Sequence, residues 1–126
     1  MAYRVSKQKF GQLVEEALAE VPEVFAAFLE EVPVEVRDRP TRRQLESAGT
    51  RKGDLLLGLY VGRPRTQRNV EDSGAMPDAI YIFQDSIEQV VSSEEQLVEQ
   101  VRTTVLHEIG HHFGMSEKDL EELGYG

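Results

Sequence analysis

Hydrophobic positions at the start of the chain recur with the spacing of an α-helix. Apolar side chains three and four residues apart run from Phe10 to Val21, and Ser6 stands where a helix N-cap is expected. Pro22 ends that helix and suits the first turn of another, whose apolar face would lie within residues 24–29. The pattern therefore predicts two consecutive helices.

The period then changes from helical to alternating. Val32, Val34 and Val36 alternate with other residues, which predicts a half-buried strand, and Pro33 favours an edge position or a strand start. Leu55 to Val61 is a mostly apolar run that suits a buried strand, and Ala79 to Phe83 is the third candidate strand. A small sheet is the expected outcome.

Two segments between these strands lack a clear period. Residues 40–54 are polar and contain glycine, so we expect a loop or a short helix there. Residues 62–78 hold two glycines and two prolines, and a loop of that length in a compact domain is usually functional or mobile. This loop would be either a lid over a cleft or a disordered segment without a function.

The last long periodic segment predicts a helix with recognisable ends. Ser92 with Glu95, and equally Ser93 with Gln96, has the spacing of a capping box, and Gly114 stands where a left-handed C-terminal cap is expected. A short closing helix would follow over residues 119–123. The aliphatic side of the long helix would contain Leu97, Val98, Val101, Val105, Ile109 and Phe113.

These elements predict one α/β (α+β) domain over residues 1–126. N-terminal helices would precede a small mixed sheet of about three or four strands, and a long helix would lie near the C-terminus. The 126 residues are enough for one ordinary domain with a real core.

Composition narrows the chemistry. The chain has no cysteine, which removes disulfides, thiol nucleophiles and cysteine-type zinc sites, so a metal would need histidine, carboxylate or water as ligands. No apolar run is long enough for a membrane span and the first residues show no secretory signal, so we expect a cytoplasmic protein without a membrane partner.

The net charge of −9 disfavours nonspecific nucleic-acid binding, but the charge is unevenly distributed. Residues 37–68 carry nine basic and three acidic side chains, a balance of +6, whereas residues 94–126 carry two basic and eight acidic ones, a balance of −6. We interpret the basic segment as solvated loops and strand ends. The alternative is that its positive charge steers an anionic substrate such as RNA toward the protein.

The chemistry concentrates in the motif HExxH, formed by His107, Glu108 and His111 within the predicted helix. Residues four apart share one face one turn apart, so both imidazoles can reach one ion, and zinc is the expected metal, with another divalent metal as the alternative. Glu108 lies about 100° round the helix, beside the ligands. There it can take a proton from water activated by the metal.

A catalytic zinc usually has three protein ligands, so a third must come from elsewhere. Gly114 would turn the chain back toward the metal, and Glu117, three residues later, is the predicted third ligand. Asp119, Glu121 or an upstream carboxylate are the alternatives. Glu117 also suits the first turn of the closing helix, where the helix dipole favours an acid. His112 is interpreted as a packing or supporting residue rather than a ligand.

The stretch HEIGHHFGMSEKDLEELG resembles the signature of small bacterial zincin-like metallopeptidases, sometimes called minimal zincins. LLLGLYVGRP, SGAMPDAIYIF and VPVEVRDRP are similar to the same family pattern, so the resemblance covers most of the chain, with the histidine motif as its most specific part. It implies a zincin-like α/β fold, one divalent metal and a peptidase-type site. It also implies His107 and His111 as metal ligands, Glu108 as general base, and Glu117 at an acidic position where aspartate is more frequent.

A peptide or protein substrate would be held as an added strand on a sheet edge, and Ala79–Phe83 is the best candidate for that edge. The alternative is that Ala79–Phe83 is an internal strand without a role in substrate binding. Oxyanion stabilisation could come from Tyr60, Tyr81, Tyr125 or Arg68, among which the sequence does not choose. The function predicted is a zinc-dependent peptidase or hydrolase. Its alternative is a zincin-like module that binds a metal or a partner without turnover.

Overall fold

The protein is described from a computed structural model, which covers residues 3–50, 54–62, 78–114 and 116–122. The side chains of Glu117 and Leu120 lie outside that description. The elements in chain order are α1 (Lys7–Ala19), α2 (Glu23–Glu31), β1 (Val34–Arg37), α3 (Arg42–Ser47), β2 (Gly58–Val61), β3 (Ala79–Phe83), α4 (Gln84–Gln89), α5 (Glu94–His112) and α6 (Glu117–Glu122).

The three described strands form one mixed sheet in the order β1–β3–β2. β1 runs parallel to β3, with Val34 opposite Ile80, whereas β2 runs antiparallel to β3, with Tyr60 opposite Ile80. The prediction that Ala79–Phe83 is an edge strand is therefore wrong. β3 is hydrogen-bonded on both sides, and the two edges of this sheet are β1 and β2.

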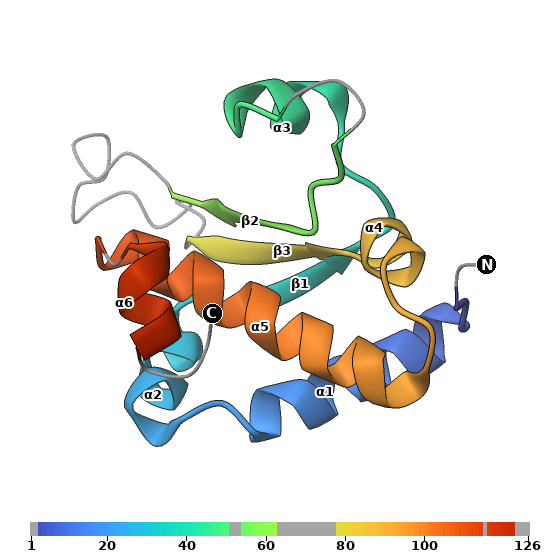
Figure 1. Ribbon diagram of the computed structural model, residues 1–126, viewed down its shortest axis with the longest axis horizontal. Helices are drawn as coiled ribbons and strands as arrows, with labels where there is room; N and C mark the ends of the chain where they lie inside the picture. Colours follow the sequence, from blue (N-terminus) through green and yellow to red (C-terminus); the bar gives the residue numbers. More distant parts are fainter. Residues whose placement is uncertain (1–2, 51–53, 63–77, 115, 123–126) are drawn as a thin grey trace, which may run out of the picture.

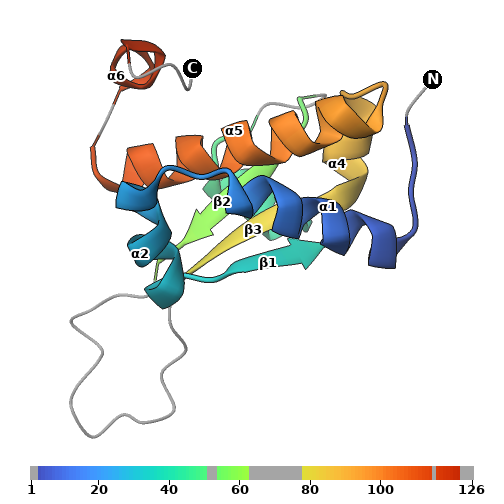
Figure 2. The same ribbon diagram turned by 90° about the horizontal axis from the view of Figure 1, so that it is seen from below.

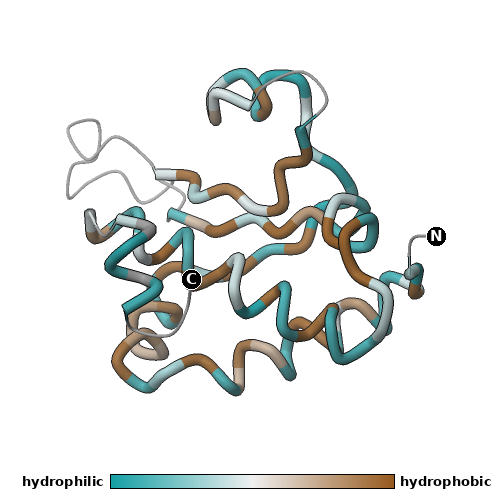
Figure 3. Tube along the Cα trace, viewed as in Figure 1, coloured by the Kyte–Doolittle hydropathy of each residue, from teal (hydrophilic) through white to brown (hydrophobic). Residues whose placement is uncertain are grey.

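The helices α1 and α5 lie side by side and cover one face of the sheet (Figures 1 and 2). Between them and the strands lies the hydrophobic core, which includes Phe10 of α1, Ile80 and Ile82 of β3, and Val101 and Val105 of α5, all fully buried. In Figure 3 the helices alternate between hydrophilic and hydrophobic positions, as one buried face requires. None of the described helices has both the length and the apolar character needed to cross a membrane.

The helix ends follow the predicted signals. Ser6 caps α1 by accepting a hydrogen bond from the Lys9 amide, and Ser93 caps α5 through the Gln96 amide. Of the two capping registers, the Ser93–Gln96 pair is thus the one that forms. Gly114 has the positive φ, 76°, of the predicted left-handed cap.

Two local predictions need correction, and one helix was not predicted. The run from Leu55 to Val61 is not a buried strand throughout, because the strand begins at Gly58 and Leu55 is 44% exposed. Phe113 is 56% exposed, since it follows the last turn of α5 and leaves the aliphatic side. The sequence pattern also did not indicate α4, which directly follows β3 and buries Ile87 in the core.

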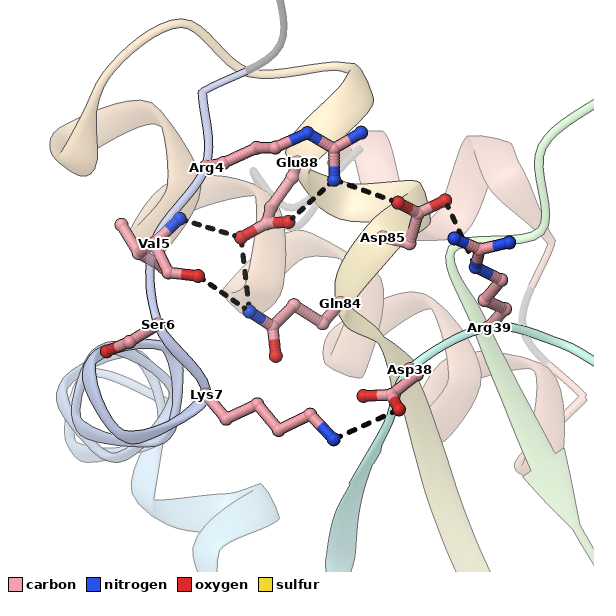
Figure 4. Close-up of a pocket in the computed structure, with 9 residues that line it drawn as sticks. All are labelled: Arg4, Val5, Ser6, Lys7, Asp38, Arg39, Gln84, Asp85 and Glu88. Atoms are coloured by element: carbon pink, nitrogen blue, oxygen red, sulfur yellow. Dashed lines mark hydrogen bonds and ion pairs between the residues drawn. The ribbon is translucent and has the colours of Figure 1, made fainter.

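A hollow of about 640 Å³ lies where the N-terminal segment meets α4, at the other end of α5 from the HExxH motif (Figures 1 and 4). The buried Glu88 carboxylate accepts hydrogen bonds from the Val5 amide at 2.9 Å and from Gln84 Nε2 at 3.1 Å. Gln84 also donates to the Val5 carbonyl, and Arg4 pairs with Asp85 at 3.0 Å. These contacts anchor the N-terminal segment to α4.

Candidate active site

The last turns of α5 present two interleaved rows of side chains, because each row joins residues four apart. The first row contains His107 and His111, whose ring centroids lie 6.2 Å apart. His107 is half-buried, with its Nε2 atom inside the molecule, and His111 is exposed. The structure therefore brings together the two histidines that the sequence predicted as metal ligands.

The second row contains Thr104, Glu108 and His112, and it faces β2. Glu108 Oε1 accepts a hydrogen bond of 2.7 Å from the backbone amide of Tyr60. His112 stacks on the Tyr60 ring, with centroids 4.6 Å apart and an interplanar angle of 19°. One residue of β2 thus contacts both Glu108 and His112.

The Tyr60 amide that holds Glu108 points away from the sheet. The Phe83 amide donates to the Leu57 carbonyl, so in this antiparallel ladder Leu57 forms a hydrogen-bonded pair with β3. Alternate residues turn their main-chain groups the other way, which directs Gly58 and Tyr60 to the outer edge of β2. Glu108 therefore lies at the outer edge of β2.

Burial raises the pKa of the Glu108 carboxyl above its ordinary value, while the Tyr60 amide and the two histidines act in the opposite direction. Burial disfavours the charged form, and the amide hydrogen bond favours it. A carboxylate with a raised pKa is a stronger base, which suits a group that must accept a proton.

A hollow of about 280 Å³ lies between α5 and the segment that leads into β2. The polar side of α5, away from its aliphatic side, lines this hollow. The lining residues are Leu56, Leu57, Gly58, Gln100, Thr103, Thr104, His107 and Glu108.

The predicted third ligand, Glu117, is the first residue of α6, directly after the turn at Gly114. Its side chain lies outside the described part of the chain. The alternative Asp119 has a different partner, since its carboxylate accepts from the Ser116 amide while Ser116 Oγ accepts from the Asp119 amide. This reciprocal pair is a capping box that begins α6.

The residues present fit a metal of the zinc type as far as the described side chains extend. Two neutral imidazoles on one helical face are common zinc ligands, and zinc–nitrogen bonds of about 2.0–2.1 Å require rings that converge on one point. No three histidine, aspartate or glutamate side chains gather closely enough to hold a metal among those that the structure describes. Of the three predicted ligands, His107 and His111 are the two whose side chains the structure describes.

His112 is a packing residue, as predicted. Its ring lies 5.2 Å from the Phe28 ring and stacks on Tyr60, so it joins α2, α5 and β2. Phe113 lies 5.1 Å from Phe28 at the exposed side of the same cluster. The end of α5 that carries the motif is thereby fixed against two other elements.

The candidate residues for oxyanion stabilisation have different surroundings in the structure. The Tyr60 hydroxyl donates to Asp78 Oδ2 at 2.8 Å, so this side chain has a structural partner. Tyr81 lies on the opposite face of the sheet from the buried Ile80 and Ile82, with the Arg37 guanidinium 4.7 Å from its ring centroid. Tyr125 and Arg68, like most of the 62–78 loop, lie outside the described residues.

Sequence reasoning missed the role of Tyr60 as the main-chain partner of Glu108. The spacing of Thr104, Glu108 and His112 is a signal that could have found the helix face involved, because it repeats every four residues. The partner on β2 has no such signal, since residues 48 positions apart meet only in the folded chain.

We compared the chain with protein families, solved structures and curated protein sequences. A family profile described as zincin-like metallopeptidase matches residues 29–126. A conserved hypothetical protein from Thermus thermophilus has a similar solved structure, with a TM-score of 0.58 and 25% sequence identity over 86% of this chain and 94% of that one. Curated protein sequences give no match. The family profile covers most of the chain, including the HExxH helix and the whole sheet, and the chain therefore belongs to the zincin-like metallopeptidase family.

Proposed function

We propose that this protein is a zinc-dependent peptidase in which Glu108 is the general base and His107, His111 and Glu117 hold the metal. The observation that carries the proposal is the contact between the HExxH helix and β2. Glu108 lies beside the two histidines and, at the same time, at the outer edge of β2, through its 2.7 Å hydrogen bond from the Tyr60 amide. The proposed base and two of the proposed ligands, His107 and His111, therefore lie beside a strand edge.

Zinc bound by these residues would supply Lewis acidity, because it lowers the pKa of water to about 7 and polarises a carbonyl oxygen. The two imidazoles supply nitrogen ligands from one helical face. Glu117 would supply an oxygen ligand from the start of α6, which follows the turn at Gly114.

The chain's own contribution to the chemistry is proton transfer at Glu108. The Tyr60 amide holds Oε1, so Oε2 is the atom that would accept the proton of the attacking water. Burial raises the pKa of this carboxyl, which strengthens the base. The same atom would then return the proton to the leaving amine, as general acid–base catalysis requires.

An extended peptide would bind along β2. β2 is an edge of the described sheet, and its outward residue Gly58 lines the 280 Å³ hollow together with His107 and Glu108. The outward main-chain groups of β2 would bind an extended peptide as an added strand, apart from the Tyr60 amide, which donates to Glu108. The scissile bond would then lie beside the site without a sequence-specific pocket.

The substitution Glu108→Gln tests the proposal. We expect the variant to bind one zinc ion per chain like the wild type, because the ligands are intact, and to lose cleavage by about 10²–10⁴-fold, because an amide cannot accept the proton. Zinc is measured by titration calorimetry and elemental analysis, and cleavage by mass spectrometry on a denatured-protein digest library.

The matching control is His107→Ala, which should lose both zinc and cleavage. Equal cleavage by wild type and Glu108→Gln would contradict the assignment of the base. Zinc binding with no cleavage of any library peptide by the wild type would instead support the alternative, a family member that holds metal without turnover.

A further inference from the structure

The contact between α5 and β2 assigns roles to two residues that the motif does not contain. Three side chains of α5, each four residues apart, meet β2 in order along the helix. Thr104 packs against Gly58, Glu108 accepts from the Tyr60 amide, and His112 stacks on the Tyr60 ring. This contact runs directly beside the histidine face.

We propose that Tyr60 and His112 are positioning residues for Glu108. The stack fixes the distance between the last turn of α5 and β2, and the Tyr60 amide then fixes one carboxylate oxygen. This inference rests on the proposed function for its catalytic meaning, although the contact itself can be tested without any turnover.

The Tyr60 side chain is held at two points. Its ring stacks on His112 and its hydroxyl donates to Asp78 Oδ2 at 2.8 Å, while residue 60 lies opposite Ile80 in the ladder. Asp78 is itself buried and directly precedes β3. The amide that holds Glu108 therefore belongs to a residue whose ring and hydroxyl both have partners.

His112 is held as well. The exposed His112 contacts the Phe28 ring of α2, with ring centroids 5.2 Å apart, as well as the Tyr60 ring of β2. Rings at such distances are attractive and sterically defined. Because His112 lies one turn after Glu108 on the same helix, a displacement of His112 would also displace the Glu108 carboxylate.

The geometry has a chemical consequence for the base. A carboxylate free to rotate would present either oxygen in many directions, whereas the Tyr60 amide restricts Oε1 and so directs Oε2. Preorganised groups avoid reorganisation during the reaction, and small errors in placement cost rate steeply. Loss of the stack should therefore reduce turnover without removing the metal ligands.

The test reads the Tyr60 amide directly by ¹H–¹⁵N NMR and hydrogen exchange on the full chain without added metal. In the wild type we expect a downfield amide proton that exchanges slowly, because it donates to a carboxylate. Glu108→Ala should lose both properties. His112→Ala should lose them in part, while His112→Phe, which retains a ring for the stack, should restore them.

Phe113→Ala is the control, because Phe113 belongs to the same aromatic cluster and contacts His112 and Phe28. We expect it to leave the Tyr60 amide unchanged. Should His112→Ala fail to fold, His112→Leu provides the same comparison, since it keeps apolar volume without a ring. A Tyr60 amide that is insensitive to both Glu108 and His112 substitutions would overturn the inference.

A second readout separates positioning from general stabilisation. His112→Ala should bind zinc with wild-type affinity and, with a library peptide that the wild type cleaves, show a reduced kcat at an unchanged KM. A lower zinc affinity with unchanged kcat would overturn the inference. Failure of the proposed function would appear as absent zinc binding or cleavage in the wild type, which the NMR result does not depend on.

Discussion

Gly58 is the residue that permits the close contact between β2 and α5. A Cβ atom added there would lie 2.6 Å from Thr104 Cγ2 and 3.0 Å from the Tyr81 carbonyl oxygen. The first distance is shorter than real Cβ contacts, and the second is tight against a backbone atom that cannot rotate away. A side chain at position 58 would therefore push β2 away from α5 and lengthen the Tyr60–Glu108 hydrogen bond.

We expect Gly58→Ala to lower the free energy of unfolding by about 1–3 kcal/mol, the usual cost of overpacking. Adding Thr104→Ser, which removes Cγ2 and retains the hydroxyl, should recover part of that loss. Urea unfolding of the two single variants and the double variant measures the coupling.

Gly11→Ala is the matched control at this scale. Gly11 lies inside α1 and an added Cβ meets nothing within 4 Å, so the same substitution should raise stability by up to about 1 kcal/mol through helix propensity. Equal effects of the two substitutions would show that steric contact with Thr104 does not matter.

At the scale of whole elements, the turn between α5 and α6 decides where the predicted third ligand can lie. Gly114 has φ 76°, and an added Cβ would meet nothing within 4 Å, so its requirement is conformational rather than steric. A left-handed conformation costs a residue with a side chain about 1–2 kcal/mol.

Gly114→Ala should therefore lower the melting temperature moderately and weaken zinc binding, because the strained turn would displace α6 and Glu117 with it. Gly114→Asn should lower the melting temperature and the zinc affinity less than Gly114→Ala does, since asparagine tolerates this conformation better. Differential scanning calorimetry and zinc titration give the two values. Zinc affinity that is equal in all three proteins would contradict the assignment of Glu117 as a ligand.

For the molecule as a whole, the N-terminal segment is joined to α4 across more than eighty positions of the sequence. The hydrogen bond from Arg4 holds the pKa of Asp85 below its ordinary value, opposed by burial and assisted by Arg39. A carboxyl with a lowered folded-state pKa stabilises the fold above its unfolded pKa, and that stabilisation disappears as the pH falls through the folded value.

We expect Arg4→Gln to reduce stability near neutral pH by about 0.2–1 kcal/mol, the range measured for partly exposed ion pairs. The difference from the wild type should shrink as the pH falls below about 3.9. Thermal unfolding across this pH range measures it. Lys7→Gln is the control, because Lys7 and Asp38 form a highly exposed pair and should contribute little.

The sequence by itself determined the local structure and the placing of the two histidines on one helical face. Ser6, Ser93 and Gly114 mark helix ends through hydrogen bonds and dihedral preferences that span only a few residues. Ser6 and Gly114 are where the sequence predicted, and Ser93 is one of the two caps that it offered. The His107–His111 pairing is equally local, since a helix alone brings together residues four apart.

Tertiary structure alone decided which strand is the edge, and therefore where a peptide could bind. The apolar pattern of Ala79–Phe83 does not distinguish a central strand from an edge, because hydrogen bonding on both sides depends on β1 and β2 arriving from distant parts of the chain. For the same reason the sequence could not reveal that Glu108 meets the Tyr60 amide. Local interactions can be read along the chain, whereas this contact exists only because two separated segments pack against one core.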